Sequence, residues 1–297
     1  MRPKTVVAIG VVFTAFSAIL VRMSDAPALV IAAYRMGFTS LFVSPLLIRE
    51  LTRDARQRRP SSVEVPSTGR STRRAVFGAI ASGAFLAAHF AFWITSLSHT
   101  SVASSTVLVT AHPIIVALLS FWFFGEHVTR RGALLMGCAL GGGILLAWGG
   151  FAVGGGAPLG NLLAFAGAMM VAAYIVIGRM VRRHLSVNRY TAIAYPVSFV
   201  LLVIAALAAG VSLGPYPLRE YLIFAALALF CTMLGHSLFN WALKYVSGTV
   251  IATSILGEPV IATLLALIIF GEVPTMATIG GGAIILASIY LFAREQR

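Results

Sequence analysis

Two stretches of this 297-residue sequence resemble each other: HPIIVALLSFWFFGE at residues 112–126 and EPVIATLLALIIFGE at residues 258–272. Each has a proline near its start and ends in Gly-Glu, and the two align without a gap at an offset of 146 residues. A glycine-rich apolar run follows each copy. The chain therefore contains an internal repeat, whose two copies are expected to occupy residues 1–150 and 151–297.

The composition places this repeat in a membrane. Hydrophobic residues make up 59% of the chain and charged residues only 10%, and the mean hydropathy is +0.93. A soluble domain carries about 25% charged residues, so this chain has too little polar surface to cover a water-soluble globule. Secreted domains, cytosolic enzymes and fibrous proteins are excluded. The apolar runs are continuous rather than alternating, which excludes a β-barrel.

A spanning helix needs about 20 mostly apolar residues, and the sequence contains ten such runs. They lie at roughly 5–22, 27–48, 75–97, 101–124, 132–150, 158–179, 190–211, 219–243, 248–270 and 275–293. The sequence thus predicts an all-α membrane protein of ten transmembrane helices, five in each repeat. Because five is odd, the second repeat enters the membrane inverted. Inverted repeats are typical of secondary transporters, with the substrate site near the midplane between the repeats.

The basic residues predict how the chain is oriented. The net charge is +13, and eight of the 22 Lys and Arg residues lie in one polar loop, residues 49–74. With the N-terminus in the cytoplasm, 19 of them fall in cytoplasmic segments and two outside. This asymmetry predicts cytoplasmic termini. The loop is expected to be disordered around residues 61–72. It suits anionic lipid headgroups better than nucleic acid, because no aromatic residues are interleaved with its arginines.

Several classes of chemistry find no support in the sequence. Cys138 and Cys231, the two cysteines, each lie inside an apolar run and have neither disulfide nor zinc spacing. The chain has no P-loop, no H-E-x-x-H, no G-x-S-x-G and no G-x-G-x-x-G. We therefore expect no metal, no cofactor and no enzymatic activity.

The whole pattern resembles the EamA-type, ten-helix branch of the drug/metabolite transporter superfamily. The resemblance rests on Pro113 with Gly125-Glu126, Glu258-Pro259 with Gly271-Glu272, and Arg35 of Tyr34-Arg35. Members of this branch are similar to bacterial exporters of amino acids and metabolites, so the resemblance implies small-molecule export. One departure is that the first repeat has His112 where the second has Glu258.

Ionisable side chains inside spans are the first candidates for function, since each costs about 2.5–3.5 kcal/mol on insertion scales. Glu258, near the middle of its predicted span, and His112 each precede a proline, and together they predict a polar spot suited to a cation, an amine or a proton. The alternatives are that Glu258 satisfies freed backbone donors or pairs with a neighbouring helix, and that His112 is a packed core residue. Arg35 could bind a substrate carboxylate, although a structural ion pair or carbonyl clamp is favoured.

The predicted spans 75–97 and 219–243 carry aromatic and hydrogen-bonding residues that could line a cavity between the repeats. The alternative is that the tryptophans of these spans belong to the aromatic belt at the membrane–water interface. The predicted substrate-binding residues are Arg35, His89, Trp93, His112, Tyr174, His236, Asn240 and Glu258. The predicted structural or gating residues are Pro113, Glu126, Pro259 and Glu272, with the two glutamates pairing with loop arginines or capping a neighbouring helix. Gly137 with Gly141 and Gly280 with Gly281 are expected to let helices approach closely.

The leading hypothesis is a secondary-active transporter that exports amino acids or similar small metabolites by alternating access. We expect a monomer in the plasma (inner) membrane, with a small-molecule substrate, membrane lipids and, as a candidate coupling ion, protons as its partners. The alternative is a passive channel, or a non-transporting or lipid-handling integral membrane protein.

Overall fold

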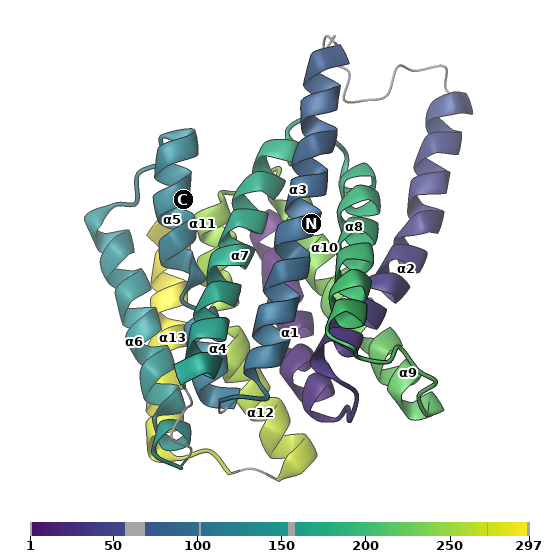
Figure 1. The fold of residues 1–297 in the computed structure, drawn as a ribbon. Helices are drawn as coiled ribbons and strands as arrows, with labels where there is room; N and C mark the ends of the chain where they lie inside the picture. The colour runs from purple at the N-terminus through teal and green to yellow at the C-terminus, as the bar shows by residue number, and fades with distance from the viewer. Residues whose placement is uncertain (1, 57–68, 101, 154–157, 272, 296–297) are drawn as a thin grey trace.

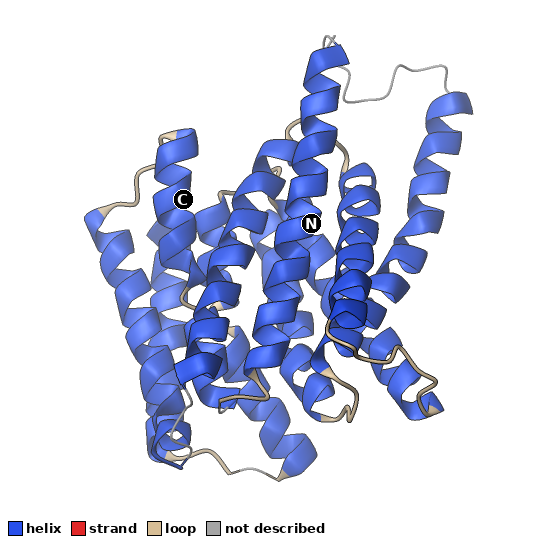
Figure 2. Ribbon diagram, in the orientation of Figure 1, coloured by secondary structure: helices blue, strands red, loops and turns tan. Residues whose placement is uncertain are grey.

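The computed structural model describes residues 2–56, 69–100, 102–153, 158–271 and 273–295 (Figure 1). Within these ranges the chain forms helices and connecting loops and no strand (Figure 2). The helices of the first repeat are α1 (Pro3–Arg22), α2 (Ala28–Arg56), α3 (Gly69–Ser96), α4 (Val102–Val109), α5 (His112–Phe124) and α6 (Arg130–Val153). Those of the second are α7 (Pro158–Arg182), α8 (Val187–Ala208), α9 (Leu218–Ala226), the π-helix η1 (Leu227–His236), α10 (Ser237–Ala242), α11 (Gly248–Ile255), α12 (Glu258–Phe270) and α13 (Met276–Glu295).

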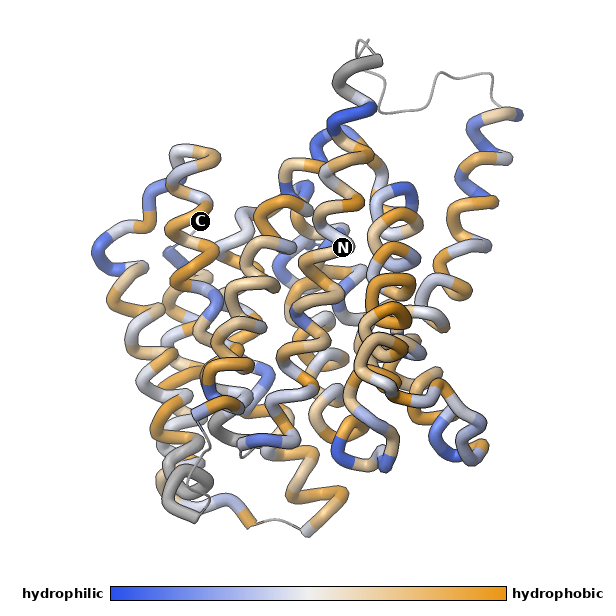
Figure 3. The backbone as a smooth tube through the Cα atoms, in the orientation of Figure 1, coloured by the Kyte–Doolittle hydropathy of each residue, from blue (hydrophilic) through white to orange (hydrophobic). Residues whose placement is uncertain are grey.

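Length and composition make this an all-α membrane fold. Eight helices in the described residues are long and apolar enough to cross a bilayer, with the shorter apolar helix α5 in addition. The count of ten spanning helices stays a prediction. Figure 3 shows hydrophobic residues over the helix middles and many of the hydrophilic ones near helix ends. Many large apolar side chains are exposed, among them Trp122 (81%) and Ile268 (77%), as expected for helices that face lipid.

The polar loop predicted over residues 49–74 is shorter than expected. Helix α2 continues to Arg56, and α3 already begins at Gly69, so both ends of the predicted loop are helical. Glu50 and Asp54 explain the extension of α2, because both bond to residues at the start of α8, including Arg189. Residues 57–68, which include most of the stretch expected to be disordered, lie outside the described residues.

The packing repeats itself across the two halves. Helix α3 packs along α7, and α1 packs in the corresponding way along η1, while α2 packs on α8 and α6 on α13. Figure 1 shows α5 rising to the end of the molecule where α6 begins, whereas α12 descends to the opposite end where α13 begins. Gly125 (φ 65°) and Gly271 (φ 69°) end these two helices in the left-handed conformation that favours glycine. Gly125 and Gly271 therefore mark helix ends at opposite ends of the molecule.

The close approach of α6 and α13 uses one expected glycine, Gly281, together with Gly142, which was not among those expected. A Cβ atom added to Gly281 would lie 2.5 Å from the Gly142 carbonyl oxygen and 2.4 Å from the Leu146 nitrogen. By contrast, no atom lies within 4 Å of a Cβ added to Gly137 or Gly141. The helix periodicity turns these two residues away from α13, so the prediction for Gly137 and Gly141 was wrong and that for Gly281 is confirmed.

Candidate functional site

Two spans are broken at equivalent places, and the breaks build the candidate site. The chain leaves α4 after Val109 and enters α5 at His112, and it leaves α11 after Ile255 and enters α12 at Glu258. The break follows from the proline at the second position of each new helix, because proline lacks an N–H and its ring clashes with the carbonyl four residues back. Glu258 is thus the first residue of a half-helix, and it still lies near the middle of the span Gly248–Phe270, which has the predicted bounds.

The hydrogen bonds at the first break reflect the missing N–H of Pro113. Pro113 cannot donate to the Val109 carbonyl, four residues earlier, as an ordinary residue would. His112 takes over this role, with its Nδ1 atom 2.9 Å from the Val109 oxygen. The proline thus fixes how His112 is oriented, and it leaves the Nε2 atom of the ring without a partner in the described residues.

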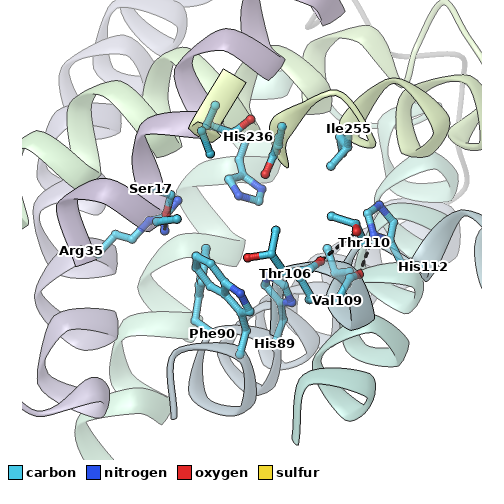
Figure 4. A pocket seen from close by; sticks show the side chains of 17 residues that line it. Ser17, Arg35, His89, Phe90, Thr106, Val109, Thr110, His112, His236 and Ile255 are labelled. Carbon is cyan, nitrogen blue, oxygen red and sulfur yellow. Dashed lines mark hydrogen bonds between the residues drawn. The ribbon is translucent and has the colours of Figure 1, made fainter. Parts of the chain in front are cut away.

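A cavity of about 70 Å³ lies beside the two breaks. Its wall comes from both repeats: α1, α2, α3, α4 and α5 on one side, and α7, η1, α11 and α12 on the other. Six of the eight predicted substrate-binding residues line it: Arg35, His89, Trp93, His112, His236 and Glu258. Figure 4 shows Arg35 and His112 at opposite sides of the cavity, with His236 between them on a third side. The structure therefore brings together residues that are up to 223 positions apart in the sequence.

Arg35 has partners that differ from those favoured by the sequence. It is 1% exposed, and it donates from Nε to the Thr232 hydroxyl (2.8 Å) and from Nη1 to the Ser17 hydroxyl (2.9 Å). Its guanidinium also lies over the Phe90 ring, 4.3 Å from the ring centre. Hydroxyls and an aromatic face thus hold it, in place of the expected carboxylate or carbonyl. These contacts tie α2 to α1, α3 and η1.

The aromatic stripe of α3 faces the cavity rather than the membrane interface. Trp93 is 8% exposed, and its ring is parallel to that of His89 with the centres 6.1 Å apart. The His89 ring is held in turn by a 3.0 Å hydrogen bond from Nδ1 to the Gly167 carbonyl on α7. Phe90 meets the edge of His236 from the other repeat at 5.6 Å. The belt interpretation of Trp93 is therefore wrong, because its ring is buried against α7.

Tyr174 and Asn240 lie outside the cavity wall. Their side chains bond to each other, with the Asn240 amide nitrogen 2.6 Å from the Tyr174 hydroxyl and 3.1 Å from the Tyr195 hydroxyl. Tyr174 also meets the edge of His236, with the ring centres 6.3 Å apart. These two residues support the cavity wall from behind, and a direct contact with substrate stays a prediction.

The ends of the half-helices α5 and α12 carry arginine contacts. Both terminal nitrogens of Arg179 contact the Glu126 carboxylate, and the Arg179 guanidinium lies 4.7 Å from the centre of the Phe124 ring. At the opposite face Arg22 lies over Phe270, also at 4.7 Å. Glu272, predicted to act like Glu126, lies outside the described residues.

Sequence reasoning missed part of the wall. Phe90, Thr106 and Thr110 line the cavity, and Thr232 fixes Arg35, yet none was predicted as a site residue. No sequence pattern identified Thr232 as a site residue, because it reaches Arg35 from the wide π-helical turns of η1. In the described residues, no group of three or more His, Cys, Asp and Glu residues could hold a metal ion.

Comparison with known proteins agrees with this arrangement. The model of the EamA-like transporter family matches residues 4–148 and again residues 158–294. The chain belongs to the EamA-like transporter family. The two matches mean that each half is one EamA unit, consistent with the repeat seen in sequence and packing. The family assignment makes the chain a multi-pass membrane protein of a transporter family.

A solved structure has a similar fold over almost the whole chain. A crystal structure of another protein is similar over 99% of this chain and 98% of its own, with a TM-score of 0.75 and 18% identical residues. At that identity the likeness shows the fold alone. No curated protein sequence matches this chain.

Proposed function

We propose that this protein is a secondary carrier that exports amino acids or similar small metabolites through the cavity between its repeats. One observation carries the proposal: both proline-broken spans begin their second half-helix at the same cavity, one with His112 and the other with Glu258. Broken helices that meet between inverted repeats are the usual substrate sites of secondary transporters, because the break exposes backbone and helix ends to the ligand.

Alternating access is supported by matching contacts at the two faces. Arg179 of α7 lies over Phe124 at the end of α5, and Arg22 of α1 lies over Phe270 at the end of α12. Helices α1 and α7 open the two repeats, and Phe124 and Phe270 are equivalent at the 146-residue offset, so the two contacts correspond in kind although their arginines do not align. We call these contacts the Phe124 latch and the Phe270 latch. Both latches are formed in this structure, and in the proposed cycle they open one at a time.

We further propose a monomer in the plasma (inner) membrane with cytoplasmic termini. The support is the distribution of basic residues, since 19 of the 22 fall in segments assigned to the cytoplasm. Single cysteines at Val65 and Gly155, in a background without Cys138 and Cys231, test the orientation. Labelling of Val65→Cys only from the cytoplasm and of Gly155→Cys only from outside is expected. The reverse result would overturn it.

Counterflow in proteoliposomes tests the function itself. Vesicles loaded with unlabelled amino acids are offered one labelled amino acid at a time, and a carrier accumulates its substrate transiently. A passive channel would equilibrate the label without accumulation. A non-transporting or lipid-handling protein would give no signal above empty vesicles. Either result would overturn the carrier proposal.

A further inference from the structure

A second hollow, a groove of about 340 Å³, lies between α5 and α6 and shares no described lining residue with the central cavity. Helix α5 packs on α7 and α11, whereas α6 packs on α4 and α13, so different neighbours hold the two helices and a groove stays open between them. Its wall is mostly apolar, with Ile114, Leu118 and Phe121 from α5 and Ala133 and Gly137 from α6. The α5–α6 connection lines one end, which we call the mouth of the groove.

The shape of the groove suits a hydrocarbon chain that lies along the helices. Ile114 and Phe121 are seven residues apart, or about 10 Å along the axis of α5. That length is most of the hydrocarbon depth of one membrane leaflet, about 15 Å. On the α6 side, a Cβ atom added to Gly137 would have no atom within 4 Å, so no protein group occupies the space beside it.

Two arginines lie at the mouth of this groove. Arg130 begins α6, three residues before Ala133 and seven before Gly137, a spacing that places all three on one side of the helix. Arg131 follows it, and both arginines are exposed. Neither side chain makes a hydrogen bond or an ion pair within the described part of the chain. Guanidinium groups with free donors bind phosphate oxygens well, often through two parallel hydrogen bonds.

The carboxylates at this end of the groove already have partners. Glu126 lines the groove, and both terminal nitrogens of Arg179 contact its carboxylate. Glu295 of α13 accepts a hydrogen bond from Thr129, the residue before Arg130. Three arginines thus stand against two carboxylates, and the mouth keeps an excess of positive charge next to an apolar groove.

A second copy of this chain would cover the groove less well than a lipid. In a two-fold dimer the same surface of each copy faces the other, so Arg130 and Arg131 would meet their own counterparts. Like charges at short range repel each other. A phospholipid with net negative charge instead brings a phosphate to the arginines and an acyl chain to the groove.

We propose that this groove binds one anionic phospholipid, with its phosphate at Arg130 and Arg131 and an acyl chain along Ala133 and Gly137. The proposed site differs from the basic loop at residues 49–74, because it joins charge to an apolar groove that holds the chain. It is separate from the central cavity, so it does not depend on the proposed transport.

Fluorescence quenching at the groove tests the site. Cys138, which follows Gly137, is exposed and Cys231 is buried, so a bimane maleimide attaches at Cys138. The detergent-solubilised protein is titrated with phosphatidylglycerol or phosphatidylcholine carrying the same brominated acyl chains, because bromine quenches only a fluorophore close to it. We expect half-maximal quenching at an about 30-fold lower concentration of phosphatidylglycerol, the effect of two arginines at a lipid surface. Equal concentrations for the two lipids would overturn the proposal.

Paired arginine variants separate this site from general charge attraction. Replacing both Arg130 and Arg131 by glutamine should abolish the preference for phosphatidylglycerol. The control replaces Arg73 and Arg74, the adjacent exposed pair near the start of α3, by glutamine and should keep the preference. If the preference survives the first pair of changes, or falls equally in both, the phosphate is not held at Arg130 and Arg131 and the proposal is overturned.

A second pair of variants tests the groove itself. Ala133→Leu fills the groove and should weaken quenching by both lipids about 10-fold, as the loss of roughly two buried methylenes predicts. Ala287→Leu makes the same change at an exposed position of α13 outside the groove and should behave as wild type. Unchanged quenching in Ala133→Leu would overturn the proposal. So would disulfide cross-linking of two unlabelled copies through Cys138 that phosphatidylglycerol does not slow, since a second copy would then cover the groove.

Discussion

The guanidinium of Arg179 lies 4.7 Å from the ring centre of Phe124 and forms an ion pair with the carboxylate of Glu126, two residues further on. Arg183 adds a second guanidinium over the same ring at 5.0 Å. The end of α5 is thereby fastened to the end of α7. Arg22 and Phe270 make the corresponding contact at the other face. The two repeats use one kind of contact twice, at the opposite ends of the molecule where α5 and α12 end.

Loosening the Phe124 latch should open the face at which α5 ends. In Glu126→Gln the ion pair is lost, and because it is partly exposed its loss is worth about 1 kcal/mol, or roughly a fivefold shift in population. We expect a cysteine at Thr106, in the cavity wall, to be labelled about fivefold faster from that face. Maleimide labelling in oriented vesicles measures the rate at which this cysteine reacts from each face.

The control for the latch experiment is Asp54→Asn. It makes the same carboxylate-to-amide change in an ion pair with Arg189, which ties α2 to α8 away from the latch. Labelling of the Thr106 cysteine should be unchanged there. If both variants speed labelling equally, general loosening of the protein explains the result and the latch does not exist.

Transport should depend on the charge of Glu258. Glu258→Gln keeps the size of the side chain but removes its negative charge and its exchangeable proton. Since this residue begins α12 at the cavity wall, we expect counterflow to fall at least about 10-fold, the effect of losing one charged contact. Glu50→Gln, in the second half of α2 and outside the cavity wall, is the matched control and should transport normally. Wild-type counterflow in Glu258→Gln would remove this residue from the mechanism.

Arg35 should be required for folding because of its geometry as well as its charge. In Arg35→Lys a single ammonium cannot reach both Ser17 and Thr232 or stack on Phe90 in the same way. We expect the free energy of unfolding to fall by about 2–4 kcal/mol, since a buried charge is left without its partners. Thermal unfolding in detergent measures the change. Arg219→Lys, where the side chain is 57% exposed, should change stability little; an equal loss there would contradict the explanation.

The contact between α6 and α13 predicts opposite outcomes for two glycines. In Gly281→Ala the new Cβ would meet backbone atoms of Gly142 and Leu146, which cannot move aside, so we expect a loss of about 1–3 kcal/mol. In Gly137→Ala no atom stands within 4 Å of the new Cβ, and the higher helix propensity of alanine should leave stability equal or slightly raised. The midpoints of thermal unfolding of the two variants test this. Equal losses of stability in Gly281→Ala and Gly137→Ala would contradict the described packing of α6 on α13.

Much of the fold could be predicted from the sequence because it depends on local and repeated features. Apolar runs predict spanning helices whatever their neighbours, since the bilayer forces the backbone to bond within each segment. The repeated proline and Gly-Glu predict where helix pairs break and end, because these residues act on the backbone of their own turn. Six of the eight predicted substrate-binding residues line the cavity for a similar reason: polar side chains in apolar spans must face the protein interior.

The tertiary structure alone decided which polar groups meet. Arg35 bonds to Ser17 and Thr232, and Asn240 bonds to Tyr174 instead of facing the cavity. Such pairings depend on side-chain directions across helices far apart in the sequence, which periodicity does not specify. The sequence by itself determined a repeated, membrane-spanning helical protein with a proline break in each half. Packing then decided that the breaks meet at one cavity.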